Sequence, residues 1–307
     1  MKYKKTLLFF SFLVLLSGWL LYAYVPKFVV EVKNPVIEQA RLNFYSEYAP
    51  KNLQQDDFKG FTYFSADSLQ LKANFYPAKQ TPKATIILLH GIRSQKEQLD
   101  SLARWVSRQG FNAVAVDLRA HGQSEGAYCT YGYYEKNDMV QLIDYLTQVM
   151  HVKPPFGIWG HSLGGAISLQ TLAIEPRIHF GIVESAYADF SQITKDYSTY
   201  YAGFQSDWLN DFVLERAGEL AQFPINQVNP IDYVTNIRQP ILLVHGTKDA
   251  KIKRQNATVL YEKIGSDKKQ LLWVEGAHHT DIHQVGGAVY FKKVLAFINE
   301  NLYPINL

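Results

Sequence analysis

Cysteine is nearly absent from this sequence, since Cys129 is the only one among 307 residues. One thiol cannot form a disulfide within the chain, so the stability of the fold has to come from packing alone. Nothing near Cys129 in the sequence is typical of an activated thiol. We therefore interpret it as a small apolar residue of the interior rather than as a nucleophile.

Excess charge is also scarce. The formal net charge is only +3, and three lysines at the N-terminus, Lys2, Lys4 and Lys5, stand close together. The rest of the chain is nearly neutral and carries no basic stripe, which argues against nucleic acid as a partner. The sequence also lacks a cluster of metal ligands, a Gly-rich phosphate loop and a dinucleotide fingerprint, so we expect no cofactor.

One long uncharged run follows those lysines. Residues 6–25 read TLLFFSFLVLLSGWLLYAYV, and a helix of this length, about 30 Å, would cross the hydrocarbon core of a bilayer. Trp19, Tyr22 and Tyr24 near its end are typical of a membrane interface. We predict a single-pass anchor over residues 1–25, with the main domain on the extracytoplasmic side. The alternative is a cleaved signal that leaves a secreted or periplasmic protein.

Beyond residue 57 the sequence alternates between strand and helix patterns. Continuous apolar runs rich in branched residues are typical of buried parallel strands. Six such runs occur, over Ala84–Leu89, Asn112–Leu118, Phe156–Gly160, His179–Glu184, Pro240–His245 and Gln270–Glu275. Two further strands resemble an antiparallel pair, Phe61–Ser65 and Gln70–Tyr76. Helices are expected between the strands, most clearly over Glu135–Met150, Gln255–Gly265 and Gly286–Leu302. This order predicts an α/β fold with a mostly parallel sheet of about eight strands, covered by helices on both faces.

Two segments stand outside this alternation. Residues 26–57 are mixed in charge and lead into the main domain at residues 58–307. The stretch between Glu184 and Pro240 has no strand pattern and is rich in aromatic residues. In parallel sheets the functional loops lie at the carboxyl ends of the strands. We therefore predict that about residues 186–235 form a helical insertion that acts as a lid over that edge.

The motif GHSLG at residues 160–164 follows one apolar strand and precedes an apolar helix. The pattern G-x-S-x-G between a strand and a helix is typical of a nucleophile elbow, a turn tight enough to require the flanking glycines. The hydroxyl of Ser162 would project at the N-terminus of the helix, where the helix dipole favours developing negative charge. Ser162 is thus the candidate nucleophile.

A serine nucleophile needs a histidine base and a carboxylate that orients the histidine. In this architecture the chain order is serine, acid, histidine. Asp249 follows the strand pattern at 240–245, and the pair His278 and His279 follows the pattern at 270–275. Glu184 and Asp189 are alternative acids. The remaining candidate histidines are interpreted as loop or supporting residues: His121, His161, His245 and His283.

Acyl transfer also needs hydrogen-bond donors for the oxyanion of the tetrahedral intermediate. The residue after the nucleophile, Leu163, should offer one backbone N–H group. The second should come from the loop His90-Gly91-Ile92, which follows the strand pattern at 84–89, and we assign it to Ile92.

Six motifs in this chain together resemble one known family. They are LLHG, DLRAHGQSEG, YGYYEKND, GIWGHSLGG, HGTKD and GAHHTD. The region from Phe58 to Leu302 resembles the serine-aminopeptidase-like branch of the α/β-hydrolase superfamily, a branch that is itself similar to monoglyceride lipases. The family position of the base corresponds to His279 rather than His278, where the family often has glycine.

The resemblance implies specific roles for the candidate residues. It implies a triad of Ser162, Asp249 and His279 and an oxyanion hole formed by the N–H groups of Ile92 and Leu163. In the motif DLRAHGQSEG it implies structural roles, in which Asp117 and Arg119 support the loop and Gly122 turns it.

These observations predict a serine hydrolase that works by two-step acyl transfer. Because the predicted lid is rich in aromatic residues, we expect hydrolysis of a carboxylic ester with an apolar, lipid-like acyl group. Alternatives within the same chemistry are an aminopeptidase-like serine peptidase and a thioesterase. A catalytically inactive, membrane-tethered binding protein is a further alternative, but such proteins usually lack a triad member.

Overall fold

An eight-stranded sheet forms the centre of the structure, a computed structural model that describes residues 2–33 and 57–302. The strand order is β1-β2-β4-β3-β5-β6-β7-β8. The strands are β1 (Lys59–Phe64), β2 (Gln70–Tyr76), β3 (Thr85–Leu89), β4 (Asn112–Val116), β5 (Phe156–His161), β6 (Ile178–Glu184), β7 (Ile241–Gly246) and β8 (Lys269–Val274). β2 pairs antiparallel with β1 and β4, and all other pairs are parallel. The predicted fold class is confirmed.

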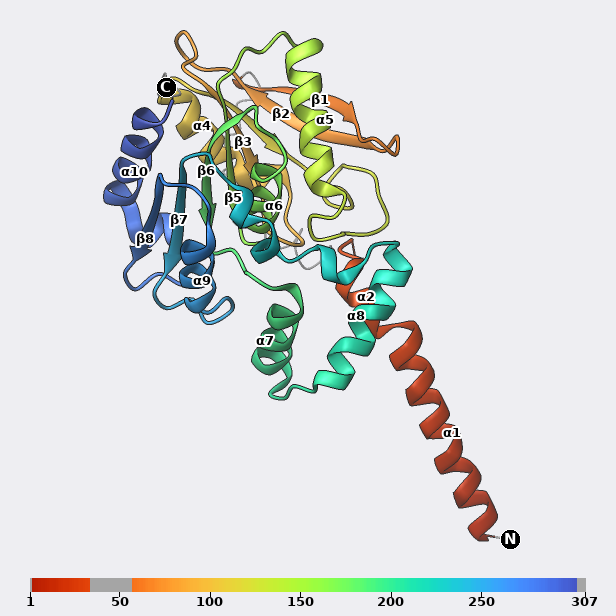
Figure 1. Cartoon of the computed structure of the whole chain (residues 1–307). Coiled ribbons are helices and arrows are strands. Elements are labelled where there is room, and N and C mark those ends of the chain that lie inside the picture. The colour runs from red at the N-terminus through yellow and green to blue at the C-terminus, as the bar shows by residue number, and fades with distance from the viewer. Residues whose placement is uncertain (1, 34–56, 303–307) are drawn as a thin grey trace.

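Helices cover both faces of the sheet (Figure 1). One face is covered by α5 (Glu135–Gln148), α6 (Leu163–Leu172) and α9 (Gln255–Lys263). The other face is covered by α4 (Asp100–Arg108) and α10 (Ile282–Glu300). Every residue of β3 and β4 is buried, because a central parallel strand has a helix layer on each side and loses the alternation of polar and apolar residues.

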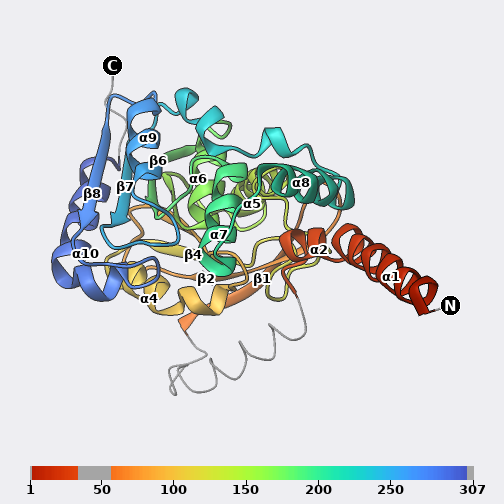
Figure 2. The same cartoon turned by 90° about the horizontal axis from the view of Figure 1, so that it is seen from below.

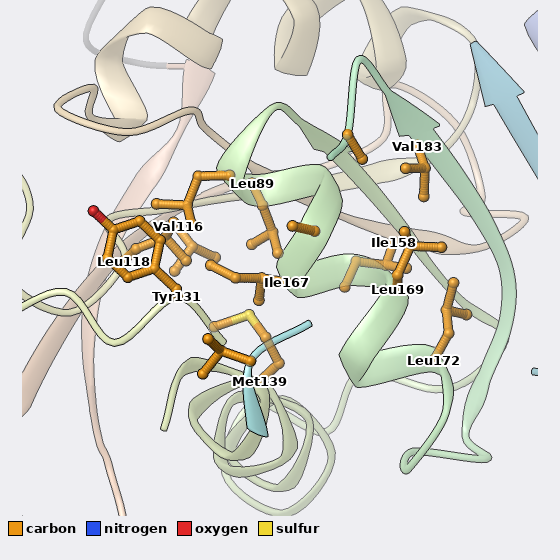
Figure 3. Close-up of a cluster of buried hydrophobic side chains, with 14 of the residues drawn as sticks. Leu89, Val116, Leu118, Tyr131, Met139, Ile158, Ile167, Leu169, Leu172 and Val183 are labelled. Carbon is orange, nitrogen blue, oxygen red and sulfur yellow. The ribbon is translucent and has the colours of Figure 1, made fainter. Parts of the chain in front are cut away.

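The core that supports the elbow lies between the sheet and α5 (Figure 3). Ile167 and Leu169 of α6 pack there with Ile158 of β5 and Met139 of α5, and all four are fully buried. Every residue of α6 is buried, which explains why its sequence is apolar on all sides. This packing holds the N-terminus of α6 against the ends of the central strands.

Two helices follow β6 and lie outside these layers (Figures 1 and 2). They are α7 (Phe190–Ala202) and α8 (Asp207–Ala221). The Asp189 side chain accepts a hydrogen bond from the Gln192 N–H group and so caps α7, and Ser206 caps α8 in the same way. Asp189, an alternative acid, is therefore used as a helix cap. Both helices fall within the segment that we interpreted as a lid.

The chain begins with α1 (Lys2–Ala23), which projects from the body, and continues after Tyr24 with α2 (Val25–Val30) beside α8 (Figures 1 and 2). Within residues 2–33 and 57–302 no helix has the combination of length and apolarity needed to cross a bilayer. Spanning requires about 20 consecutive apolar residues in one helix. The prediction of a membrane anchor, with the main domain on the extracytoplasmic side, is therefore wrong on this finding.

Candidate active site

The backbone of Ser162 is strained at the junction of β5 and α6. Its φ of 54° and ψ of −116° lie in a region that residues with a side chain rarely adopt. A Cβ atom at Gly160 would lie 2.1 Å from the carbonyl oxygen of Gly164, and one at Gly164 would lie 2.4 Å from the carbonyl oxygen of Leu89. Both glycines are therefore required for the chain to turn within this space. The turn leaves the Ser162 side chain at the start of α6.

Three loops bring the side chains of Ser162, Asp249 and His279 together. Nε2 of His279 lies 3.0 Å from Oγ of Ser162, and Nδ1 lies 2.8 Å from Oδ2 of Asp249. Because a carboxylate only accepts hydrogen bonds, Nδ1–H donates to Asp249 and Nε2 is left to accept the Ser162 hydroxyl proton. The backbone N–H groups of Lys251 and Ile252 donate to Oδ1 of Asp249 at 3.0 and 2.9 Å, which fixes the carboxylate.

The two titrating members of this group are shifted in ways that suit base catalysis. Burial raises the pKa of Asp249, but its hydrogen bonds with His279 and with the N–H group of Ile252, together with the nearby histidines, outweigh this effect, so the net pKa is lowered. Burial lowers the pKa of His279 below its ordinary value despite the opposing effect of Asp249. Asp249 is thus charged and His279 neutral at neutral pH, as a general base requires.

The structure separates the two competing histidines. The His278 side chain is exposed, and its Nδ1 lies 3.1 Å from the carbonyl oxygen of Lys248. Of these two histidines, only His279 lies within hydrogen-bonding distance of Ser162. Glu184, the other alternative acid, accepts hydrogen bonds from Nε1 of Trp159 and Nε2 of His283 instead.

The remaining histidines have structural partners. Nδ1 of His121 donates to the carbonyl of Arg119, and Nε2 of His245 donates to the carbonyl of Ile252. The ring of His161 lies 5.0 Å from the ring of His279, measured between centroids. It also contributes to the lowered pKa of His279. The structure thus places His121 and His245 in hydrogen bonds with loop carbonyls and His161 beside His279.

The residues of the two predicted oxyanion donors, Ile92 and Leu163, line the same cavity as Ser162. Leu163 is the first residue of α6, so its N–H group has no partner within the helix. The Leu118 N–H group donates to Nε2 of His90 at 3.2 Å, so Nδ1 of His90 must carry the proton and donate to the Gly91 carbonyl at 2.8 Å. Because N–H and C=O point in opposite directions across a trans peptide, this bond turns the Ile92 N–H group away from His90.

Comparisons with known proteins agree with this fold. Residues 80–210 match the family described as Serine aminopeptidase, S33. The chain is 26% identical to Monoglyceride lipase of Rattus norvegicus over 84% of this chain and 91% of the lipase. It is 25% identical to the uncharacterized protein YfhR of Escherichia coli (strain K12), over 91% of this chain and 94% of that protein. An esterase of Pyrococcus furiosus superposes with a TM-score of 0.68 at 23% identity, covering 80% of this chain and 92% of the esterase.

The sheet order, the elbow and these matches decide the fold. The chain has the α/β-hydrolase fold. Residues 80–210 and the six motifs are similar to the serine-aminopeptidase family.

The motif DLRAHGQSEG forms a loop that hydrogen bonds and ion pairs hold in place. The Asp117 carboxylate accepts hydrogen bonds from the backbone N–H of Lys96 and from its Nζ at 2.7 and 2.6 Å. Gly122 turns at a φ of 48°, where a Cβ would lie 2.2 Å from the Asp117 carboxylate. Arg119 pairs with Asp138 at 2.6 Å. The Lys96 contacts tie the loop after β4 to the segment after β3, which carries Ile92, and the Arg119 pair ties the same loop to α5.

A cavity of about 450 Å³ opens beside Ser162. Ile92 and Leu163 lie on its wall, together with side chains from α7, α8 and α2. Tyr197 of α7 also lines it, and burial raises the pKa of this tyrosine to about 12 while its interaction with the Ser162 hydroxyl opposes the shift. Tyr197 thus stays neutral next to the nucleophile, a position that no local sequence pattern indicated.

Cys129 lies in the interior of the protein. Cys129 is fully buried, and burial raises the pKa of its thiol well above its usual range, so the thiol stays protonated. Within the described residues, no group of three His, Cys, Asp or Glu side chains is arranged to hold a metal ion.

Proposed function

We propose that this α/β-hydrolase cleaves carboxylic esters of apolar acyl groups by two-step acyl transfer. The observation that carries the proposal is the continuous chain of hydrogen bonds from Asp249 through His279 to Ser162, which ends in an apolar cavity. The similarity to a lipase and an esterase supports the same reaction.

In the first step His279 accepts the hydroxyl proton of Ser162 as Oγ attacks the ester carbonyl carbon. The charge that develops on the carbonyl oxygen is stabilised by the N–H groups of Ile92 and Leu163. His279, now an imidazolium held by Asp249, gives its proton to the alcohol oxygen as the carbon–oxygen bond breaks. The products are the free alcohol and an acyl ester on Ser162.

In the second step His279 takes a proton from water, and the resulting hydroxide attacks the acyl carbonyl. The same two N–H groups stabilise the second oxyanion. The proton then passes from His279 to Oγ of Ser162 as the carboxylic acid leaves, which restores the starting state.

The cavity wall favours an apolar acyl group over a charged one. Aromatic and aliphatic side chains dominate its lining: Phe28, Tyr131, Tyr187, Phe190, Ile193, Tyr197, Tyr201, Phe204, Leu209, Val213 and Leu214. Of the charged side chains, Lys195 pairs with Asp207 at 2.8 Å and Arg93 donates to the carbonyl of Phe28. Among the described residues that line the cavity there is no Asp or Glu to bind the terminal ammonium group of a peptide. An ester is therefore the better-supported substrate than the amide that an aminopeptidase cleaves.

Replacement of the nucleophile tests the proposal directly. With p-nitrophenyl butyrate, Ser162→Ala should lose activity by several orders of magnitude and lose labelling by a fluorophosphonate probe, because no other group can form the acyl ester. The matched control is Ser101→Ala, at an exposed position of α4, which should retain both. Full activity in Ser162→Ala would contradict the assignment, and a panel of aminoacyl amides and thioesters would separate the alternative substrates.

A further inference from the structure

The short helix α2 is part of the cavity wall. Val25, Phe28 and Val29 line the same cavity as Ser162. α2 packs against α8, which supplies another wall (Figures 1 and 2). The acyl cavity is therefore closed on one side by a segment that precedes the whole α/β core in sequence.

Three consecutive backbone carbonyls attach α2 to the body. The carbonyl of Phe28 accepts a hydrogen bond from Nη2 of Arg93, that of Val29 from the hydroxyl of Tyr131, and that of Val30 from the N–H group of Cys129. The last carbonyls of a helix have no partner within it, and here the body supplies those partners. α2 is thus bound by the fold rather than merely lying against it.

Side-chain burial holds the same segment in place. Val30 is fully buried and Val32 is 4% exposed, and both belong to the core cluster on the α5 and α6 face of the sheet. Nζ of Lys33 donates to the carbonyl of Ser124 at 2.5 Å, in the loop that follows β4. These contacts continue the attachment beyond the end of α2.

Two of the residues that hold α2 belong to the active site. Arg93 directly follows Ile92, the proposed oxyanion donor, and itself lines the cavity. Tyr131, which binds the carbonyl of Val29, also lines the cavity. The position of α2 is therefore coupled to the wall residues around Ser162.

The Phe28 side chain exposes apolar surface that a ligand can cover. Its side chain is 57% exposed although it is apolar and lines the cavity, and Val25 is 38% exposed in the same way. Exposed apolar area beside a nucleophile is favourable to cover with an apolar group. Lys27, between them, does not line the cavity and pairs with Glu31 instead.

We propose that α2 is a specificity wall of the acyl site and that Phe28 determines how well the enzyme accepts long apolar acyl groups. This proposal rests on the proposed ester hydrolysis and names the part of the substrate that the segment recognises. The acyl chain lies along Phe28 while its carbonyl carbon is held at Ser162.

The test compares Phe28→Ala and Phe28→Leu with the control Lys27→Ala. For each variant, kcat/KM is measured with p-nitrophenyl octanoate and with p-nitrophenyl acetate. We expect the octanoate-to-acetate ratio to fall about tenfold in Phe28→Ala, mainly through KM, because apolar contact to the long chain is lost. Phe28→Leu should keep the ratio within about twofold of the native value, because leucine restores most of the apolar area. An unchanged ratio in Phe28→Ala, or the same fall in Lys27→Ala, would overturn the proposal.

A binding measurement separates this proposal from the proposed reaction. In the Ser162→Ala background, the affinity for the fluorescent fatty acid cis-parinaric acid should fall about tenfold on Phe28→Ala. If the native protein hydrolysed no ester, the proposed function would fail, and the affinities would still decide the role of α2. Equal affinities before and after the Phe28→Ala substitution would overturn the proposed role of α2 and leave the proposed ester hydrolysis untouched. Because Phe28 is exposed, its replacement should leave the thermal unfolding midpoint unchanged, which checks that the variant is folded.

Discussion

The side chains of Ser162, Asp249 and His279 are polar, yet each residue is less than a tenth exposed. A buried polar group is costly unless it is hydrogen-bonded. The three meet this requirement by bonding to one another and, for Asp249, to two backbone N–H groups. The same bonds that make their burial tolerable fix the imidazole in the orientation that a base requires.

The two adjacent histidines should differ sharply on replacement. His279→Ala removes the only imidazole of the pair that reaches Ser162 and should lower kcat/KM for p-nitrophenyl butyrate by several orders of magnitude. His278→Ala should stay within about threefold of the native value, because that side chain is exposed and contacts only the loop backbone. A larger loss in His278→Ala than in His279→Ala would assign the base to the other residue.

The lowered pKa of His279 predicts the pH dependence of the reaction. Protonated His279 cannot accept the Ser162 proton, so activity is lost as the pH falls through this pKa. Because burial places the pKa below its ordinary value, which is about 6.5, the acid limb of kcat/KM should have its midpoint below about pH 6.5. His161→Gln should move that midpoint upward, since the nearby His161 helps to lower the pKa. A midpoint above about 6.5 in the native enzyme would contradict this explanation.

At the scale of elements, the junction of β5 and α6 depends on a close approach of two backbones. A methyl group at Gly160 would lie 2.1 Å from the Gly164 carbonyl oxygen and 2.4 Å from Oγ of Ser168, so backbone and side chain both crowd it. We expect Gly160→Ala to lower the free energy of unfolding by about 1–3 kcal/mol, as overpacking typically does, and to reduce activity because Ser162 shifts. Urea denaturation measures the first effect.

Gly60 of β1 provides the matched control for this prediction. A Cβ there would lie 3.5 Å from Oδ1 of Asn74, an ordinary contact distance. Gly60→Ala should therefore leave the free energy of unfolding within about 0.5 kcal/mol of the native value. Equal destabilisation by the two substitutions would show that the close approach at Gly160 does not set the cost.

At the scale of the whole molecule, Glu184 links elements from distant parts of the chain. Its carboxylate accepts hydrogen bonds from Trp159 of β5 and from His283 and Tyr290 of α10. Its backbone carbonyl accepts the N–H group of Ser162 at 2.9 Å. One residue at the end of β6 thus joins the elbow to the helix that follows the His279 loop.

This link makes stability depend on pH in a defined window. Burial opposes the ionisation of Glu184, but the nearby His283 and His161 outweigh it and the pKa of Glu184 is lowered, so its contribution is lost as the pH falls below about 4.5. Burial opposes the protonation of His283, but Glu184 raises its pKa above the ordinary value of 6.5, so its contribution is complete below 6.5 and lost as the pH rises. The pair should therefore stabilise the fold most between about pH 4.5 and 6.5.

Thermal unfolding of His283→Gln tests this window. The difference in Tm between the native protein and the variant should be larger at about pH 5.5 than at about pH 8.5, because the ion pair is fully formed only at the lower value. The control His151→Gln, at an exposed position, should leave Tm unchanged at both values. Equal differences for His283→Gln at the two values would exclude an ion-pair contribution.

The strands, the order of the loops and the tight turn at residues 160–164 could all be predicted from the sequence, because each depends on residues that are neighbours in the chain. All eight strand predictions lie within two residues of the observed bounds. The rule that the carboxyl ends of parallel strands share one edge then predicted which loops would meet. The family likeness pointed to His279, and the direction of each side chain in the loop separated it from His278 in space.

The surroundings of Ser162 depend instead on tertiary packing. The apolar run at residues 6–25 suggested a membrane span, which the described helices do not support. Nothing in the sequence indicated that Val25 and Phe28 line the cavity. Tyr197 and Glu184 likewise acquire their positions through contacts between segments far apart in sequence. A cavity is bounded by surfaces of separate elements, and no local periodicity encodes which elements come together.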